Sequence, residues 1–143
     1  MDEFDFDVTI FGEPASGKNS RRIVSIKNKP RLIKSKKALE YSKDFDRQCP
    51  VLENLIEGSV AVWLDVYYGS RRPDLATELI LDLLQGRVIK NDRQVKAIIS
   101  LWNLDRENPR CRIRLKTIGL ETSTGLSSFK LSKILGTSMK EDL

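Results

Sequence analysis

Apolar and polar positions alternate along the first part of the chain in a way that predicts strands. Residues 4–11 form one alternating run, which predicts a first strand. Two short strand-like runs, 23–26 and 31–34, flank the turn-forming and basic segment 27–30. A pair of strand-like runs on either side of such a segment is typical of a β-hairpin.

The spacing then changes to that of helices. Ser35 is expected to cap a helix that ends near Pro50, with Ala38, Leu39 and Phe45 among its apolar positions. A continuous apolar run over 60–68 follows Gly58 and predicts a buried strand. A second helix is expected from about Asp74 to Gln85, because leucines recur on one side of it and Gly86 closes it.

Two more strands are predicted over 94–104 and 111–118, separated by a turn around Pro109. The resulting order βββαβαββ predicts a single α+β domain, with two main helices packed against a mixed or antiparallel sheet. We assign this domain to residues 1–120. Residues 121–143 are rich in Ser, Thr, Gly and Lys and are expected to form a polar tail.

Composition excludes several classes of chemistry. The chain of 143 residues contains no histidine, so Ser-His and Cys-His dyads and histidine–metal nucleases are excluded. Two isolated cysteines, Cys49 and Cys111, are too few for a disulfide framework or a zinc site. No apolar run is long enough for a membrane span, and the acidic N-terminus does not resemble a signal peptide. A cytoplasmic protein is therefore expected.

Basic residues are concentrated rather than evenly spread, within a net charge of +5. Nine of the twenty residues from Lys18 to Lys37 are Lys or Arg, without an intervening acid, and a second basic group occupies 106–116. Such a stretch favours a polyanionic partner, most simply nucleic acid, although a solvated face is the alternative. The candidate DNA-binding residues are Lys18, Asn19, Arg21, Arg22, Lys27, Lys29, Arg31, Lys34, Arg71 and Arg72.

A phosphate-loop motif is nearly present in Gly12-Glu13-Pro14-Ala15-Ser16-Gly17-Lys18-Asn19. Two features argue against a nucleotide-binding loop. Asn19 occupies the position where a Ser or Thr hydroxyl should reach Mg²⁺, and the expected hairpin follows where the motif needs a helix N-terminus. We therefore interpret the match as coincidental.

Acidic residues mark one side of the second predicted helix. Asp74, Glu78 and Asp82 fall at i, i+4 and i+8, and like charges at this spacing destabilise a helix slightly. The stripe suggests a nearby cation, although an exposed acidic face or an Asp74 N-cap would explain it too. Asp74 and Asp82 would lie about 12 Å apart along the helix axis, too far to share one Mg²⁺. Asp92 is the expected partner of Asp74.

These segments together resemble the RusA family of Holliday-junction resolvases, the crossover junction endodeoxyribonucleases. The resemblance covers roughly residues 6–118 and is most specific over 71–95, in Arg71-Arg72-Pro73-Asp74-Leu75, Asp82-Leu83-Leu84-Gln85-Gly86 and Asn91-Asp92-Arg93-Gln94-Val95. It implies a homodimer that binds four-way DNA junctions and cuts them with Mg²⁺ in recombination and repair. A phage or prophage origin is in keeping with this family.

The resemblance also implies the site. Asp74 matches the first aspartate of the family's Asp-Leu-Asp, Asp82 the later helix aspartate, and Asp92 the aspartate before Gln. Asp74 and Asp92 are thus the expected metal ligands, with Glu78 or Asp82 orienting a bound water.

The chain departs from the family pattern at three points. Ala76 stands at the second aspartate of Asp-Leu-Asp, the usual helix lysine has no counterpart, and the spacing from Asp74 to Asp82 is two residues shorter. Another alignment places Arg72 and Asp74 at the two aspartates. The alanine at position 76 has three explanations. The chain is a naturally weakened member of the family, a member that uses Glu78 as a substitute ligand, or a variant whose catalytic aspartate was deliberately replaced. The rival function is a non-catalytic DNA-binding protein that keeps the fold.

Overall fold

The computed structural model describes residues 3–15 and 21–119. Within these ranges the elements follow the predicted order βββαβαββ, so the α+β class is confirmed. They are β1 (Phe6–Phe11), β2 (Arg21–Ile26), β3 (Lys29–Lys34), α1 (Lys36–Gln48), β4 (Val60–Tyr68), α2 (Glu78–Leu84), the short 3₁₀ helix η2 (Asp92–Gln94), β5 (Val95–Leu104) and β6 (Arg110–Thr117). The predicted tail, 121–143, lies outside the described residues.

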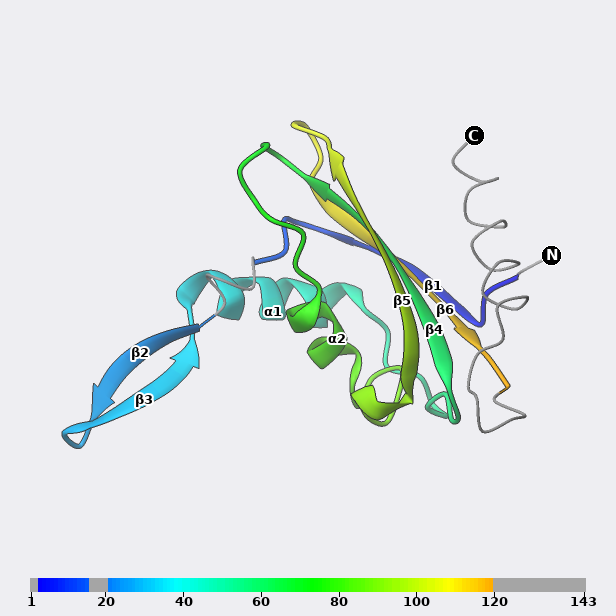
Figure 1. Cartoon of the computed structure of the whole chain (residues 1–143), viewed down its shortest axis with the longest axis horizontal. Coiled ribbons are helices and arrows are strands. Elements are labelled where there is room, and N and C mark those ends of the chain that lie inside the picture. Colours follow the sequence, from blue (N-terminus) through cyan, green and yellow to red (C-terminus); the bar gives the residue numbers. More distant parts are fainter. Residues whose placement is uncertain (1–2, 16–20, 120–143) are drawn as a thin grey trace.

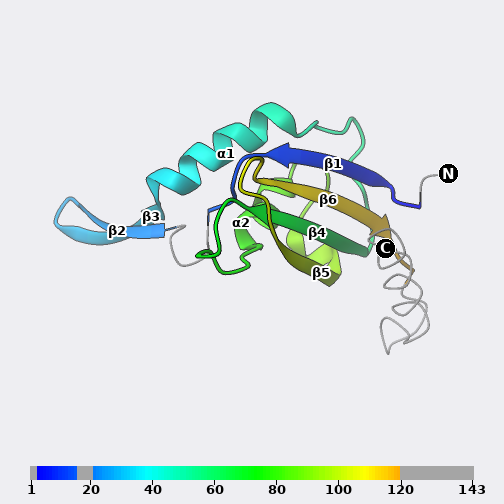
Figure 2. The same ribbon diagram turned by 90° about the horizontal axis from the view of Figure 1, so that it is seen from above.

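The main sheet has four strands in the order β1-β6-β4-β5. The β1/β6 and β6/β4 pairs are antiparallel, whereas β4 and β5 run parallel. A parallel pair needs a crossover connection, and α2 supplies it. Both helices lie on the same side of this sheet, as two views at right angles show (Figures 1 and 2).

The core lies between the sheet and the helices. The side chains of β4 that face the helices, from Val60 through Leu64 to Tyr68, are buried completely. Phe45 of α1 and Ile80 of α2 pack against them. A central strand with so many buried positions explains the continuous apolar run of its sequence.

The second helix begins later than predicted, at Glu78 instead of Asp74. Residues 72–77 form an irregular segment between the end of β4 and the start of α2. Only Glu78 and Asp82 therefore share a helical face, and the predicted stripe of three carboxylates is wrong at Asp74. The first helix, in contrast, begins as predicted, with Ser35 Oγ accepting a hydrogen bond from the Ala38 amide at 3.2 Å.

The β2–β3 hairpin projects away from the rest of the molecule (Figures 1 and 2). Its two-residue turn places Lys27 at φ 53° and Asn28 at φ 63°. Left-handed backbone at both turn positions gives the twist that joins two antiparallel strands, and asparagine tolerates it better than most residues. Among the described residues, no helix is long and apolar enough to cross a membrane.

Candidate functional site

Two aromatic side chains hold the segment that carries Asp74 and Ala76. The Tyr68 hydroxyl donates to the Asp74 carbonyl oxygen at 3.1 Å and accepts a hydrogen bond from the Ala76 amide at 3.2 Å. Trp102 stacks on Tyr68 with ring centroids 5.7 Å apart, and its Nε1 donates to the Pro73 carbonyl oxygen at 2.9 Å. We call residues 73–76 the clamped segment. The clamp fixes its backbone while the Asp74 side chain remains exposed.

A further carboxylate, Glu13, lies at the same end of the sheet. Its Oε1 accepts a hydrogen bond from the Gly69 amide at 2.8 Å, and its Oε2 lies 3.5 Å from Lys37 Nζ. Burial raises the pKa of Tyr68, and the carboxylates of Glu13 and Asp74 contribute to the rise, whereas the Ala76 amide opposes it. The Tyr68 hydroxyl therefore keeps its proton for the Asp74 carbonyl at neutral pH.

Asp82 and Asp92 are brought to one place at the other end of α2. Gln85 follows the helix, and its Oε1 accepts a hydrogen bond from the Asp92 amide at 3.3 Å. Its Nε2 donates a hydrogen bond to Asp82 Oδ1 at 3.5 Å. Asn91 caps η2, where its side chain accepts from the Arg93 amide at 3.0 Å. The side chains of Asp82 and Asp92 are both exposed.

Asp74 and Asp92, the two predicted ligands, do not come together within one chain. The clamped segment is bonded to Tyr68 and Trp102 near the ends of β4 and β5, whereas Asp92 immediately precedes the start of β5. Because β4 and β5 are parallel, the start of β5 lies at the opposite end of the pair from Tyr68 and Trp102. The nine residues of β4 span roughly 26 Å between these two ends. Mg²⁺ ligands lie about 2.1 Å from the ion. The arrangement within one chain therefore does not fit one metal ion shared by these residues.

No set of three possible metal ligands gathers elsewhere in the described residues either. Over residues 3–15 and 21–119, no three carboxylates or cysteines gather closely enough to hold a metal ion. Ala76 occupies the position of the expected third ligand, half-buried in the clamped segment. Glu78, the proposed substitute, is the first residue of α2 and is exposed.

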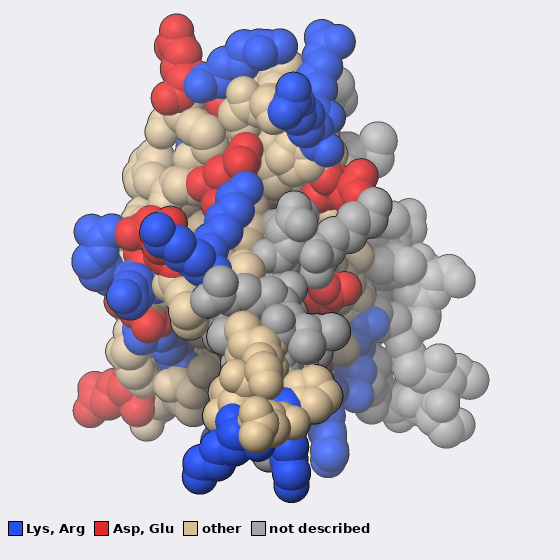
Figure 3. Space-filling view, turned by 90° about the vertical axis from the view of Figure 1, so that its left-hand side faces the viewer, with Lys and Arg blue, Asp and Glu red and all other residues tan. Residues whose placement is uncertain are grey.

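The predicted basic surface is divided between two places. Lys27 and Lys29 are exposed at the tip of the hairpin, and Figure 3, which looks toward this tip, shows Lys or Arg side chains on either side of uncharged residues. Arg71 and Arg72 are exposed in the connection that leads to the clamped segment. Lys18 and Asn19 lie outside the described residues. For Arg21, Arg22, Arg31 and Lys34 the structure describes only the backbone, which lies in the hairpin strands away from its turn.

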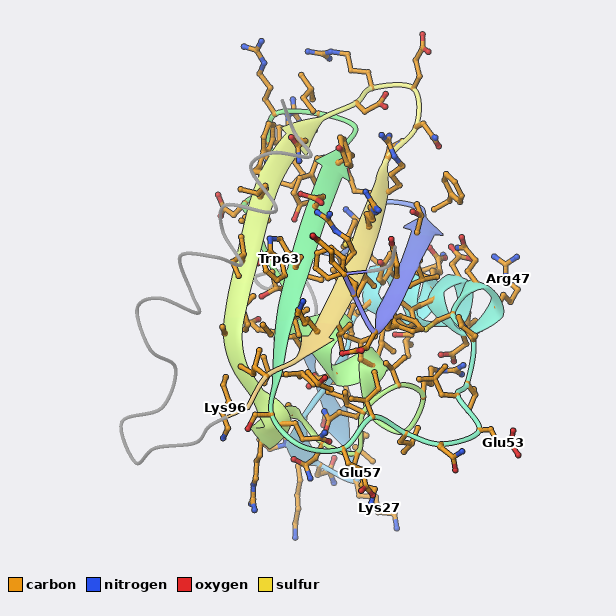
Figure 4. All side chains as sticks on the ribbon, turned by 90° about the vertical axis from the view of Figure 1, so that its right-hand side faces the viewer. Lys27, Arg47, Glu53, Glu57, Trp63 and Lys96 are labelled. Carbon is orange, nitrogen blue, oxygen red and sulfur yellow. The ribbon has the colours of Figure 1, made fainter. Side chains whose placement is uncertain are left out.

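The second basic group of the sequence lies on the sheet face that is turned away from the helices, where Trp63 also lies (Figure 4). Arg110, Arg112 and Arg114 alternate along β6 and form ion pairs with Asp105, Asp7 and Asp65, each at 2.7 Å. Three of its positive charges are thus compensated within the protein. The hairpin and Arg71-Arg72 remain the better candidates for contacts with phosphates.

The sequence did not indicate Glu13 as part of this region. It is 56 residues from Gly69, and its only local context was the incomplete phosphate-loop motif. A strand, β2, follows that motif where a nucleotide-binding loop needs a helix, which agrees with our interpretation. Residues 16–20 of the motif lie outside the described residues.

No protein-family model matches this chain, and no curated protein sequence is significantly similar to it.

Proposed function

We propose that this protein is a RusA-like, Mg²⁺-dependent endodeoxyribonuclease that acts on four-way DNA junctions as a homodimer. The observation that carries the proposal is the clamped segment. The part of the sequence that most resembles the family's metal-binding motif is fixed at the end of the central strands, with Asp74 exposed to solvent. Catalytic and binding residues often lie on surface loops that a rigid scaffold holds in place.

The hairpin supports the DNA-binding half of the proposal. It projects from the body and carries Lys27 and Lys29 at its exposed tip, so it can reach a groove or a branch point without moving the core. A two-stranded ribbon fits the major groove of B-form DNA, and lysines bind its phosphates. For an enzyme of this class we place the protein in the cytoplasm of a bacterial cell or of a phage-infected host.

The deciding experiment compares the chain with its Ala76→Asp variant on a labelled synthetic four-way junction. Gel shift measures binding, and a denaturing gel measures Mg²⁺-dependent nicking. We expect both proteins to bind the junction in preference to duplex DNA and the variant to cut it at least tenfold faster. Ala76→Asn is the matched control, since it has a similar size but lacks the negative charge. Equal nicking by the Asp and Asn variants would contradict the assignment of position 76.

A Glu78 variant in the same assay tests whether Glu78 acts as the substitute ligand. If Glu78 substitutes for the missing aspartate, Glu78→Gln removes any nicking by the chain as it stands while junction binding is retained. Glu53→Gln is the control for the loss of one exposed carboxylate, because Glu53 lies outside the candidate site.

A non-catalytic junction-binding protein is the second candidate. It is favoured by Ala76 and by the separation of Asp74 from Asp92 within one chain. This function predicts tight, selective junction binding with no nicking by the chain, by Ala76→Asp or by any variant of Glu78.

A further inference from the structure

The tip of the β2–β3 hairpin exposes an apolar side chain away from the core. Ile26, the last residue of β2, is 47% exposed, and every residue from Ser25 to Pro30 is exposed. No described side chain of the hairpin belongs to either hydrophobic cluster of the molecule. The hairpin projects from the body, so Ile26 is presented to the surroundings without packing on the rest of the protein (Figures 1 and 2).

Lysines flank this isoleucine. Lys29 pairs with Ile26 across the ribbon, and Lys27 follows Ile26 in the turn. Lys27 has a left-handed backbone, with φ 53°, at a turn position where glycine, asparagine or aspartate is usual. Lysine adopts this conformation less readily than those residues, so the turn keeps a positive charge at its tip at some cost to the hairpin.

The chemistry of the tip fits DNA better than a further protein strand. Pro30 pairs with Ser25 in the ribbon and has no amide to donate to another strand, so strand addition is disfavoured beside the tip. Lysines bind phosphates, and apolar side chains such as isoleucine insert between neighbouring base pairs in several DNA-binding proteins. An exposed isoleucine between two lysines combines both kinds of contact.

We propose that the hairpin tip is a wedge: Ile26 inserts between base pairs at the branch point of a four-way junction while Lys27 and Lys29 bind the flanking phosphates. Insertion into continuous duplex separates two stacked base pairs, which costs free energy. At a branch point the strands part and continuous stacking is interrupted, so the same insertion costs less. Ile26 thus makes the protein prefer a junction to duplex DNA without reading its sequence.

The wedge rests on the proposed function for its substrate, four-way DNA, but it needs neither a metal ion nor the clamped segment. Recognition of the branch is assigned to the hairpin, whereas cutting is assigned to the region of Asp74. The two roles belong to different elements, so each can be removed without the other.

Unstacking of the bases is the direct test. A synthetic four-way junction carries 2-aminopurine beside the branch point, and a second junction carries it in the middle of one arm. The fluorescence of this base rises when it loses its stacked neighbours. Without Mg²⁺, we expect saturation with the protein to raise the fluorescence at least twofold at the branch and to leave it unchanged in the arm.

Variants of the tip separate insertion from phosphate binding. Ile26→Ser should abolish the rise in fluorescence and weaken junction binding at least tenfold, while duplex affinity and the slope of log K against log salt stay unchanged. Ile26→Leu should retain the rise, because leucine is also apolar and of similar volume. Lys27→Gln should show the opposite pattern to Ile26→Ser: a lower affinity and a smaller salt slope, with the full rise at saturation.

Leu39→Ser is the matched control, because Leu39 is 45% exposed on α1, outside the hairpin. It should change neither the fluorescence nor the affinity, and circular dichroism checks that every variant is folded. The wedge is overturned if the natural chain binds no DNA, if it binds the junction without a rise, or if Ile26→Ser keeps the rise at saturation. An effect of Ile26→Ser on self-association alone, measured by sedimentation, would assign the tip to a protein contact and overturn the wedge too.

These outcomes can be distinguished from those of the proposed function. A rise that depends on Ile26, with no cutting by the chain or by Ala76→Asp, would support the wedge and contradict the nuclease. Junction cutting by Ala76→Asp without any rise at the branch would support the nuclease and contradict the wedge.

Discussion

The hydroxyl of Tyr68 accepts a hydrogen bond from the amide of Ala76, eight residues along the chain, at 3.2 Å. The same hydroxyl donates to the Asp74 carbonyl oxygen, so one buried side-chain atom satisfies two backbone groups of an irregular segment. Irregular backbone beside a core is costly unless its polar groups are paired. Tyr68 therefore helps to hold this irregular segment in place ahead of α2, which starts at Glu78.

Tyr68→Phe should destabilise the protein by about 1–3 kcal/mol, because it leaves two backbone groups without their partner. The Ala76 amide should also exchange with deuterium faster. Tyr41→Phe is the matched control. Its hydroxyl is buried without a hydrogen-bond partner among the described residues, so its removal should be neutral or slightly stabilising. Chemical denaturation and hydrogen exchange measure both effects, and equal losses from the two variants would refute the role of the Tyr68 hydroxyl.

This relationship also explains where prediction from the sequence succeeded and failed. The apolar run of β4 predicted its bounds because burial on both faces leaves a continuous signal. The start of α2 was wrong because the pattern from Asp74 to Leu84 is compatible with a helix. The competing bonds come from Tyr68 and Trp102, and Trp102 lies far along the chain.

The candidate site was predictable only in part, for a similar reason. Its acidic residues could be named from the sequence, but their distances depend on the parallel pairing of β4 and β5. The hairpin was predictable because its pairing is local, with a two-residue turn. Glu13 was not, because its contacts with Gly69 and Lys37 form only in the folded chain.

Removing the lysines at the hairpin tip should weaken DNA binding without affecting the fold. Lys27→Gln and Lys29→Gln should each lower junction affinity and reduce the slope of log K against log salt by about 1, because fewer counterions are released. Thermal unfolding should not change, since both side chains are exposed and the described hairpin residues take no part in the core. Fluorescence anisotropy at several salt concentrations gives both quantities.

The matched control for these variants is Lys43→Gln, which removes an exposed lysine from α1. It should change neither affinity nor salt slope. If the slope of log K against log salt falls as much for Lys43→Gln as for Lys27→Gln, the hairpin lysines contribute no more to DNA binding than other exposed lysines.

The ion pair of Arg114 with Asp65 should matter far more to stability than its neighbour on β6. Arg114 and Asp65 are nearly inaccessible, with side-chain exposures of 1% and 8%, whereas those of Arg112 and Asp7 are 43% and 42%. Arg114→Leu should cost about 3–5 kcal/mol because it removes the cation that is paired with a buried carboxylate. Arg112→Leu should cost about 1 kcal/mol or less. Urea denaturation of both variants tests this, and similar losses would show that burial does not decide the difference.

Acid should weaken the turn between β5 and β6 through Asp105. The Arg110 guanidinium bonds this carboxylate at 2.7 Å and lowers its pKa below the usual 3.8, while the amides of Glu107 and Asn108 contribute less. A carboxyl group with a lowered pKa in the folded state contributes stability above its ordinary pKa. That stability is lost as the pH falls through the lowered value. Asp105→Asn should therefore reduce stability at pH 6 by a constant amount, and the difference from the wild type should disappear toward pH 2.

Arg110→Gln provides the companion measurement, because it removes the main cause of the lowered pKa and leaves the carboxylate in place. It should reduce the pH dependence of the free energy of unfolding at acid pH, as Asp105→Asn does. Since the pair lies at the surface, added salt should reduce both effects. Free energies of unfolding measured from pH 2 to pH 7 at low and high salt decide the matter. Parallel profiles for the wild type and both variants would show that the charge of this pair does not contribute to acid sensitivity. The turn would then be held by the amides of Glu107 and Asn108, which donate to Asp105 Oδ1, whatever the charge on that side chain.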